Sequence, residues 1–133
     1  MRNFFNKIFT EWSFINYCFQ RIGMWNRYDL VEGVNHAFKI QITNLLLPFF
    51  AIPYLYFNGP EGIFIFIFLG PFVFLIFHFC KKHLTENISN LNLDEKYLKT
   101  KRSIRVLNFI LGLLLTILCI VYFIVSLMTI RYI

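Results

Sequence analysis

The densest group of chemically versatile side chains is the segment HFCKKH at residues 78–83. It contains His78, Cys80 and His83, which are residue types that bind metals and haem, and it has two lysines between them. On an α-helix, Cys80 and His83 lie about 60° apart and share a face, whereas His78 lies about 140° from His83. A zinc site here would therefore need ligands from other parts of the chain.

The remaining histidine, His36, precedes an apolar run near the same predicted membrane boundary. A haem held by His36 and His78, or a quinone near them, is one hypothesis. This layout is similar to that of the three-span anchor subunits of succinate dehydrogenase, although their usual motifs are absent. The alternative is an interfacial histidine, a buried thiol and lysines at lipid headgroups. We favour this alternative, and the sequence predicts no resident cofactor.

A second group consists of polar residues spaced by four, three and four positions, which places them on one stripe of a helix. Its members are Glu32, His36, Lys39 and Thr43. The stripe could face a partner or a proton path, or it could be a solvated face at the headgroups, which we favour. No acidic residue lies inside a predicted span, which argues against an autonomous pump or transporter.

The composition is that of a polytopic membrane protein. Of 133 residues, 58% are hydrophobic and only 15% are charged, against about 25% charged in soluble domains. The net charge of +6 comes from residues that flank the apolar runs, which suits anionic lipids better than nucleic acid. Three cysteines do not form a disulfide framework. The residue usage, with Ala only at Ala37 and Ala51, indicates an AT-rich coding genome such as that of an organelle.

The first 28 residues form a segment of their own. Apolar residues recur every three or four positions over residues 3–22 and predict an amphipathic helix that ends near Gly23. The helix is too polar to span a bilayer, so we place it on the membrane surface. The competing interpretation is a helix packed on a partner protein.

Residues 29–133 form a three-span membrane domain. Asp29 is the predicted N-cap of the helix that leads into the first apolar run. The spans cover about 40–57, 63–80 and 106–130, each long enough to cross the hydrocarbon layer. Prolines within the first two runs should bend those helices: Pro48, Pro53 and Pro71.

The third run contains the best candidate for a helix-packing seam. Asn108, Gly112 and Thr116 follow one another at intervals of four and share a face of the helix. Small residues are otherwise rare in the spans, so packing should depend on large apolar side chains.

Loop charge predicts the orientation. Basic residues cluster in the N-terminal segment and in the polar loop 81–105, whereas the turn at 58–62 has none. The N-terminus and this loop therefore lie inside and the C-terminus outside. Five cations are predicted to contact anionic lipid headgroups: Lys81, Lys82, Lys101, Arg102 and Arg105.

These observations predict an all-α protein of a bacterial cytoplasmic or mitochondrial inner membrane, with one interfacial helix and three spans. Catalytic triads, phosphate loops and CxxC motifs are absent, so we expect no enzyme activity. The leading hypothesis is a non-catalytic subunit of a larger membrane complex, with an organelle-encoded subunit of a respiratory complex as a special case. The alternatives are an immunity protein against a pore-forming toxin and a haem- or quinone-binding anchor.

Overall fold

The computed structural model describes residues 2–23, 29–58 and 62–130, and 95% of these residues are helical, without strands. The all-α prediction is therefore confirmed. The elements are α1 (Arg2–Gly23), α2 (Leu30–Asn58), α3 (Gly62–Phe79), the π-helical turn η1 (Cys80–Leu84), α4 (Thr85–Ser89), α5 (Leu93–Lys99) and α6 (Arg102–Ile130).

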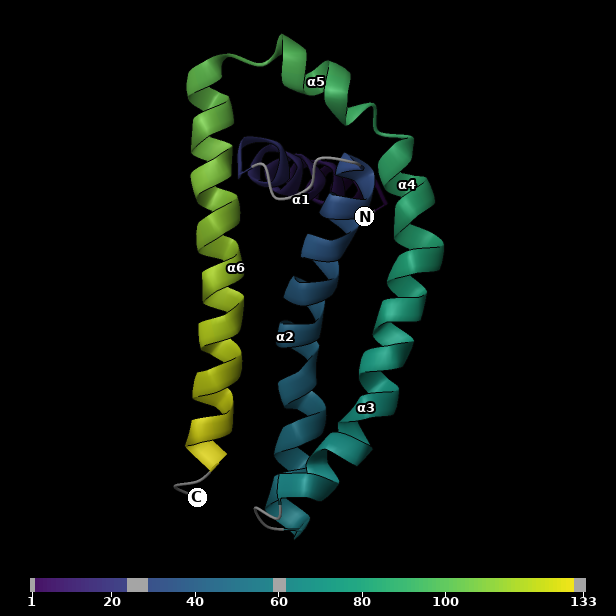
Figure 1. Ribbon diagram of the computed structural model, residues 1–133, viewed down its shortest axis with the longest axis vertical. Helices are drawn as coiled ribbons and strands as arrows, with labels where there is room; N and C mark the ends of the chain where they lie inside the picture. Colours follow the sequence, from purple (N-terminus) through teal and green to yellow (C-terminus); the bar gives the residue numbers. More distant parts are fainter. Residues whose placement is uncertain (1, 24–28, 59–61, 131–133) are drawn as a thin grey trace.

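The long helices α2, α3 and α6 run side by side, and α1 lies across α2 and α6 (Figure 1). α3 returns antiparallel to α2 and continues through η1 into α4. α5 then passes over the end of the bundle to the start of α6. α1 is seen almost end-on between α2 and α6, and it packs against both of them.

Two of the described helices are long and apolar enough to cross a membrane. They are the segments Leu30–Tyr56 of α2 and Arg102–Thr129 of α6, with mean hydropathies of 1.3 and 2.8. α3 is an 18-residue apolar helix beside α2. Both α2 and α3 continue through their prolines, so the lost backbone hydrogen bonds do not break either helix.

The start of α2 agrees with the sequence prediction. The Asp29 carboxylate accepts hydrogen bonds from the backbone N–H groups of Val31 (2.9 Å) and Glu32 (3.1 Å), so Asp29 is the predicted N-cap. The capping residue of α5 is Asn92, which has a left-handed backbone. Asp94 lies in the first turn, where its carboxylate is used in contacts with α1.

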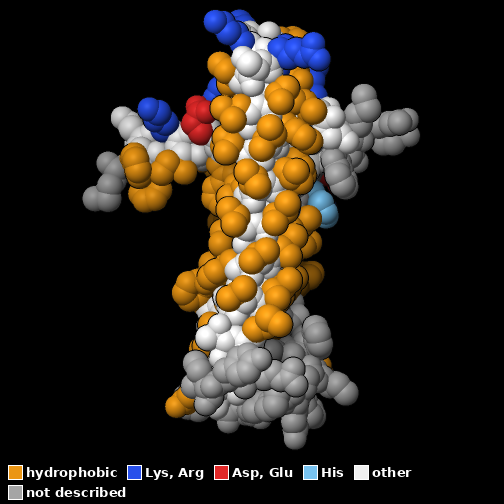
Figure 2. Space-filling model, turned by 90° about the vertical axis from the view of Figure 1, so that its left-hand side faces the viewer, with side chains coloured by type: hydrophobic (Ala, Val, Ile, Leu, Met, Phe, Trp, Pro, Cys, Tyr) orange, Lys and Arg blue, Asp and Glu red, His pale blue; other side chains and the backbone are white. Residues whose placement is uncertain are grey.

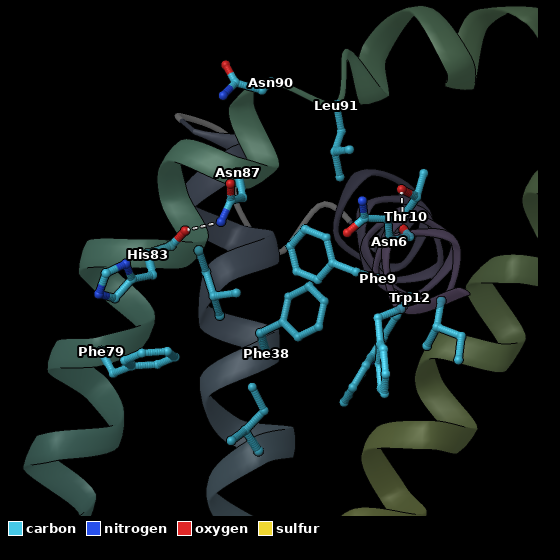
Figure 3. A pocket seen from close by; sticks show the side chains of 14 residues that line it. Asn6, Phe9, Thr10, Trp12, Phe38, Phe79, His83, Asn87, Asn90 and Leu91 are labelled. Carbon is cyan, nitrogen blue, oxygen red and sulfur yellow. Dashed lines mark hydrogen bonds between the residues drawn. The ribbon is translucent and has the colours of Figure 1, made fainter. Parts of the chain in front are cut away.

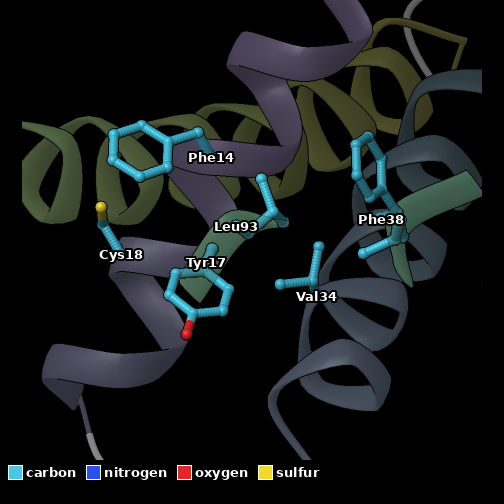
Figure 4. Packing of buried hydrophobic residues seen from close by; sticks show 7 residues of the cluster. Phe14, Tyr17, Cys18, Val34, Phe38 and Leu93 are labelled. Carbon is cyan, nitrogen blue, oxygen red and sulfur yellow. The ribbon is translucent and has the colours of Figure 1, made fainter. Parts of the chain in front are cut away.

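The main core lies where α1, α2, α4 and α5 meet (Figure 4). It consists of Phe14, Tyr17 and Cys18 from α1, Val34 and Phe38 from α2, and Ile88 and Leu93 from the loop region. A smaller cluster farther along the bundle joins α2 to α3, and its buried members are Leu47, Ala51 and Leu69. Because α1 contributes Phe14, Tyr17 and Cys18 to the main cluster, α1 is an integral part of the hydrophobic core.

Burial along α1 differs from the simple amphipathic pattern. Polar Ser13 and Asn16 are completely buried, whereas Phe4 and Phe5 are each 64% exposed. As a polar residue, Ser13 is not part of the apolar pattern over residues 3–22 that predicted this helix. Its burial has a physical cause: α2 and α6 both pack on the second half of α1, and they cover polar positions along with apolar ones.

Candidate functional site

A buried polar junction joins α1, α2 and α6. The Gln41 side-chain carbonyl accepts hydrogen bonds from Trp12 Nε1 (2.7 Å) and Asn16 Nδ2 (3.0 Å). The Gln41 amide in turn donates to Asn16 Oδ1 (2.9 Å) and to Thr116 Oγ1 (3.0 Å). Gln41 and Asn16 are fully buried, so these bonds replace water for both amides. The junction fixes the crossing of the three helices.

α1 crosses α6 at Gly112, where the two backbones approach closely. A Cβ atom at Gly112 would lie 2.7 Å from Phe19 Cβ and 3.2 Å from the Ile15 carbonyl oxygen. Only glycine leaves room for this crossing. Two residues of the predicted helix-packing seam therefore contact other helices: Gly112 lies against α1, and Thr116 lies in the polar junction. The third, Asn108, is half-buried nearer the start of α6.

A charged cluster fastens α5 to the end of α1. Asp94 accepts a hydrogen bond from the Tyr17 hydroxyl (2.8 Å) and forms an ion pair with Arg21. The guanidinium of Arg21 lies 4.5 Å from the centre of the Tyr97 ring, and that of Arg105 lies 4.6 Å from it. Burial and the hydrogen bond to Asp94 raise the pKa of Tyr17 to about 12. Hydrogen bonds from Tyr17 and Arg21 lower the pKa of Asp94.

A second contact between α5 and α1 is centred on Lys96. Its ammonium group pairs with Glu11 (2.8 Å) and lies 4.5 Å from the centre of the Phe14 ring. The neighbouring Cys18 is fully buried, and burial raises the pKa of its thiol to about 11. The thiol is therefore protonated at neutral pH, as expected for a structural cysteine rather than a nucleophile.

An elongated groove of about 660 Å³ separates the first half of α1 from α2 and from the α3–η1–α4 wall (Figure 3). Its floor is apolar and includes Phe9, Phe38, Ile42 and Phe79. Its rim is polar but uncharged. The rim residues are Asn6, Thr10, His83, Asn87 and Asn90.

The segment HFCKKH forms the join between α3 and α4. Residues 80–84 are π-helical, so the α-helical spacing that placed Cys80 and His83 on one face does not apply. Cys80 is buried, whereas His83 is exposed with its ring 4.7 Å from that of Phe79. The expectation that Cys80 and His83 share a face is therefore wrong.

The two candidate haem ligands lie at different levels of the bundle. Asn35 donates a 2.6 Å hydrogen bond to Thr85, which places the neighbouring His36 level with the start of α4. His78 lies seven residues before Thr85 on the same continuous helical path, on the order of 10 Å lower. Both imidazoles are exposed. Within the described residues, no three His, Cys, Asp or Glu side chains gather into a potential metal site.

The predicted polar stripe on α2 divides into two parts. Glu32 and His36 are exposed, whereas Lys39 and Thr43 are half-buried. The Lys39 ammonium lies 5.6 Å from the centre of the Phe77 ring on α3. The lower part of the stripe is thus turned toward the chain's own α3, and only the upper part is open to a partner.

The predicted headgroup cations gather near the loop end of the bundle, where Figure 2 shows Lys and Arg side chains above a long hydrophobic face. Lys81, Lys101 and Arg102 are exposed, and Arg105 is half-buried. The side chain of Lys82 lies outside the described residues.

Sequence reasoning missed the members of the polar junction other than Thr116. Trp12 is one of the apolar residues that recur over residues 3–22, and the sequence pattern gave Asn16 and Gln41 no role. A signal was available, because Ser13, Asn16 and Gln20 recur at helical spacing on α1. Three polar residues on one face could have indicated a helix that packs against polar partners.

Compared with family models, curated proteins and solved structures, the chain matches none of them. Its class is therefore defined by its fold: an all-helical protein with two helices that could cross a membrane.

Proposed function

We propose that this protein is a non-catalytic, three-span subunit of an inner-membrane complex and that it docks on a partner helix through the outer face of α6. The observation that carries this proposal is a continuous apolar heptad stripe on α6. The stripe comprises Leu107, Leu111, Leu114, Leu118, Val121, Val125 and Met128, all of which are between 41% and 63% exposed.

Membrane placement follows from where α1 crosses the long helices. From Gly112 to the end of α6 is about 27 Å, and from Gln41 to the end of α2 is about 26 Å. The 18 residues of α3 also span about 27 Å. All three lengths are close to the hydrocarbon thickness of about 30 Å. This agreement supports α3 as a third membrane-spanning helix and a position for α1 at the membrane–water interface.

The shape of α1 gives further support for that level. Its first half projects from the bundle as the left arm in Figure 2, with hydrophobic side chains along the lower edge and a basic side chain above. The exposed apolar residues of this arm are Phe4, Phe5 and Ile8. A helix at a membrane surface has this arrangement, because its apolar edge enters the acyl chains while its cations remain among the headgroups.

The orientation of the proposed subunit follows the distribution of charge. A group of exposed cations, Lys99, Lys101 and Arg102, lies at the loop end of the bundle, where Figure 2 shows basic side chains above the hydrophobic face. By the positive-inside rule, this end faces the cytoplasm or matrix and the C-terminus faces the opposite side.

The buried polar side chains where α1 crosses α2 and α6 are engaged in structural hydrogen bonds, which supports a non-catalytic role. Trp12, Asn16, Gln41 and Thr116 hydrogen-bond to one another. Two ion pairs, Arg21–Asp94 and Glu11–Lys96, hold α1 and α5 together.

The spacing of the α6 stripe suits helix pairing. Its residues recur at intervals of four and three over about 32 Å, which is the a/d repeat of a knobs-into-holes contact. Gly112 and Cys119 lie on the opposite, buried side of α6. The stripe therefore faces away from the chain's own helices.

The charge at the start of α6 favours a different chain over a second copy. Lys101 and Arg102 are exposed where the stripe begins. In a membrane, two copies pair in parallel, which would bring these cations together. A transmembrane helix with acidic residues at its inner boundary fits the stripe better.

The test is co-purification in mild detergent with matched variants. The wild-type chain should elute with resident subunits in fixed stoichiometry, and Leu114→Ala/Leu118→Ala should release it from them. Ile120→Ala, at an exposed position beside the stripe, should keep the complex intact. Helical content measured by circular dichroism should be the same for all three proteins. Recovery of the wild-type chain only as a free monomer would refute the proposal.

A further inference from the structure

We propose that the groove between α1 and the α3–η1–α4 wall binds an isoprenoid quinone, which is a neutral planar ring with two carbonyl groups and a long hydrocarbon tail. This inference rests on the membrane placement proposed above, and it goes beyond the docking role because it requires no partner subunit. The groove has Phe9 and Trp12 from α1 on one side and Phe79 from α3 on the other. With α1 at the membrane–water interface, the ring lies at that level and the tail extends into the bilayer.

The lining of the groove favours a ligand without charge. The described residues that line it include no Lys, Arg, Asp or Glu, and its polar rim is formed mainly by side-chain amides. A charged headgroup buried in the groove would have no partner of opposite charge, which costs free energy. A small number of neutral polar groups above an apolar floor is instead typical of a site for a neutral organic ligand.

A second, apolar groove continues the first along the bundle. It has a volume of about 350 Å³, lies between α2 and α3, and shares Ile42 and Phe79 with the first groove. The stacked rings of Phe50 and Phe72, with centroids 4.3 Å apart, lie at its far end. From Phe72 to Asn87 is about 20 Å along α3, η1 and α4. Together, the two grooves fit a ligand with a polar head and a long hydrocarbon tail.

The floor of the first groove suits a planar head. The rings of Phe9 and Phe38 are stacked, with centroids 5.7 Å apart and 22° between their planes. The Trp12 ring lies 4.9 Å from that of Phe38. A planar conjugated ring packs on such a surface as aromatic side chains pack on one another. A glycerol head has no ring face, so the floor favours a quinone over a neutral glyceride.

Side-chain amides stand on both sides of that floor. Asn6 on α1 and Asn87 on α4 line the two sides of the groove (Figure 3), and both residues are exposed. Asn87 donates a 2.7 Å hydrogen bond to the His83 carbonyl, and its amide has a second N–H to donate. The two carbonyl oxygens of a quinone lie at opposite edges of its ring. Each can therefore accept a hydrogen bond from the amide on its own side.

This site is different from the histidine pair that the sequence suggested. Neither His36 nor His78 is among the described residues that line the groove. The His83 imidazole lies against Phe79 and points away from the floor (Figure 3). The quinone is thus held by amides and by packing on aromatic rings rather than by imidazoles.

Quenching of tryptophan fluorescence by added quinone tests the site, because a quinone accepts an electron from an excited indole that it contacts. The chain has two tryptophans, and Trp25→Phe leaves Trp12, which lines the groove, as the single emitter. This protein, in phosphatidylcholine nanodiscs, is titrated with a short-tailed menaquinone. We expect quenching that saturates when each chain has bound a single quinone.

Matched variants in the same background separate the groove from quinone dissolved in the bilayer. Asn6→Leu and Asn87→Leu each remove one donor, and each should weaken the saturable binding by roughly fivefold. Asn3→Leu, at an exposed position on α1 outside the groove, should leave it unchanged. Circular dichroism checks that all three variants keep the helical content of the parent. If Asn87→Leu lowers that content through its lost bond to His83, Asn6→Leu alone decides the result.

Quenching that rises in proportion to added quinone, equally in all variants, would overturn the site and leave only quinone dissolved in lipid. Saturable quenching that neither Asn6→Leu nor Asn87→Leu weakens would overturn it as well. Displacement of the quinone by an equal amount of diacylglycerol would show that the occupant is a neutral glyceride instead.

The quinone site and the docking role of α6 fail separately. Failure of α6 docking leaves the titration unchanged, because the nanodiscs contain only this chain. Absence of quinone binding leaves the co-purified complex intact.

Discussion

Asn16 on α1 and Gln41 on α2 exchange two hydrogen bonds, one in each direction, across a fully buried contact. The paired amides satisfy each other where water is excluded, so the crossing helix is fixed in one register against α2. Thr116 extends the same pairing to α6. The α1 helix is thereby held to the long helices by directional bonds as well as by apolar packing.

Removal of Gln41 should therefore weaken the whole helix crossing. Gln41→Leu deprives Asn16 and Trp12 of a buried partner, and we expect a loss of about 1–3 kcal/mol in the free energy of unfolding. Denaturant unfolding in detergent micelles, followed by circular dichroism, measures this change. Asn3→Leu, at an exposed position on α1, is the control and should have little effect.

The double variant Asn16→Leu/Gln41→Leu tests the physical reason for that loss. Replacing both amides removes the unsatisfied group along with its partner, so much of the lost stability should return. If the double variant were less stable than Gln41→Leu alone, reciprocal amide pairing would not explain the effect.

Adding a methyl group at Gly112, where α1 crosses α6, should lower the stability of the protein. Gly112→Ala would place its Cβ 2.7 Å from Phe19 Cβ, so α1 must move, at a cost of about 1–3 kcal/mol. Gly70→Ala on α3 has open space around the new methyl group, and it should be neutral or stabilise the helix by up to about 1 kcal/mol. Thermal unfolding of the two variants gives the comparison. Equal midpoints would contradict the close crossing.

The sequence predicted the helices of this protein better than their contacts. Apolar runs and the Asp29 cap placed α2 and α6, because those features act within a few residues along the chain. The junction of Asn16 with Gln41 joins positions 25 residues apart, and no local pattern specifies that pairing. The π-helical turn at Cys80 was missed for the same reason: residues 78–83 read as an ordinary α-helix.

High pH should weaken the attachment of α5 to α1. Burial first, and then the hydrogen bond to Asp94, raises the pKa of Tyr17 from 10.0 to about 12. The folded protein therefore retains a proton that the unfolded chain releases. The contribution of Tyr17 to stability is fully present below pH 10 and is lost as the pH rises through about 12.

Phenolate absorbance gives the measurement for Tyr17. The titration of wild-type protein minus that of Tyr17→Phe isolates the single hydroxyl, and its midpoint should lie near pH 12. Over the same range, the unfolding midpoint should fall more steeply for wild type than for Tyr17→Phe. A difference titration centred at pH 10 would show that the hydroxyl is not held in this cluster.

Cysteine labelling from the two sides of the membrane should establish that α6 crosses it. Ser103 and Thr129 are exposed near opposite ends of α6, and each can be replaced singly by Cys after the three native cysteines, which are buried, are changed to Ala. Because the cations gather at the start of α6, an impermeant maleimide should label Ser103→Cys only in inside-out vesicles and Thr129→Cys only in right-side-out vesicles. Labelling of both sites from one side would mean that α6 does not span the bilayer, and reversed labelling would mean that the positive-inside rule fails for this chain.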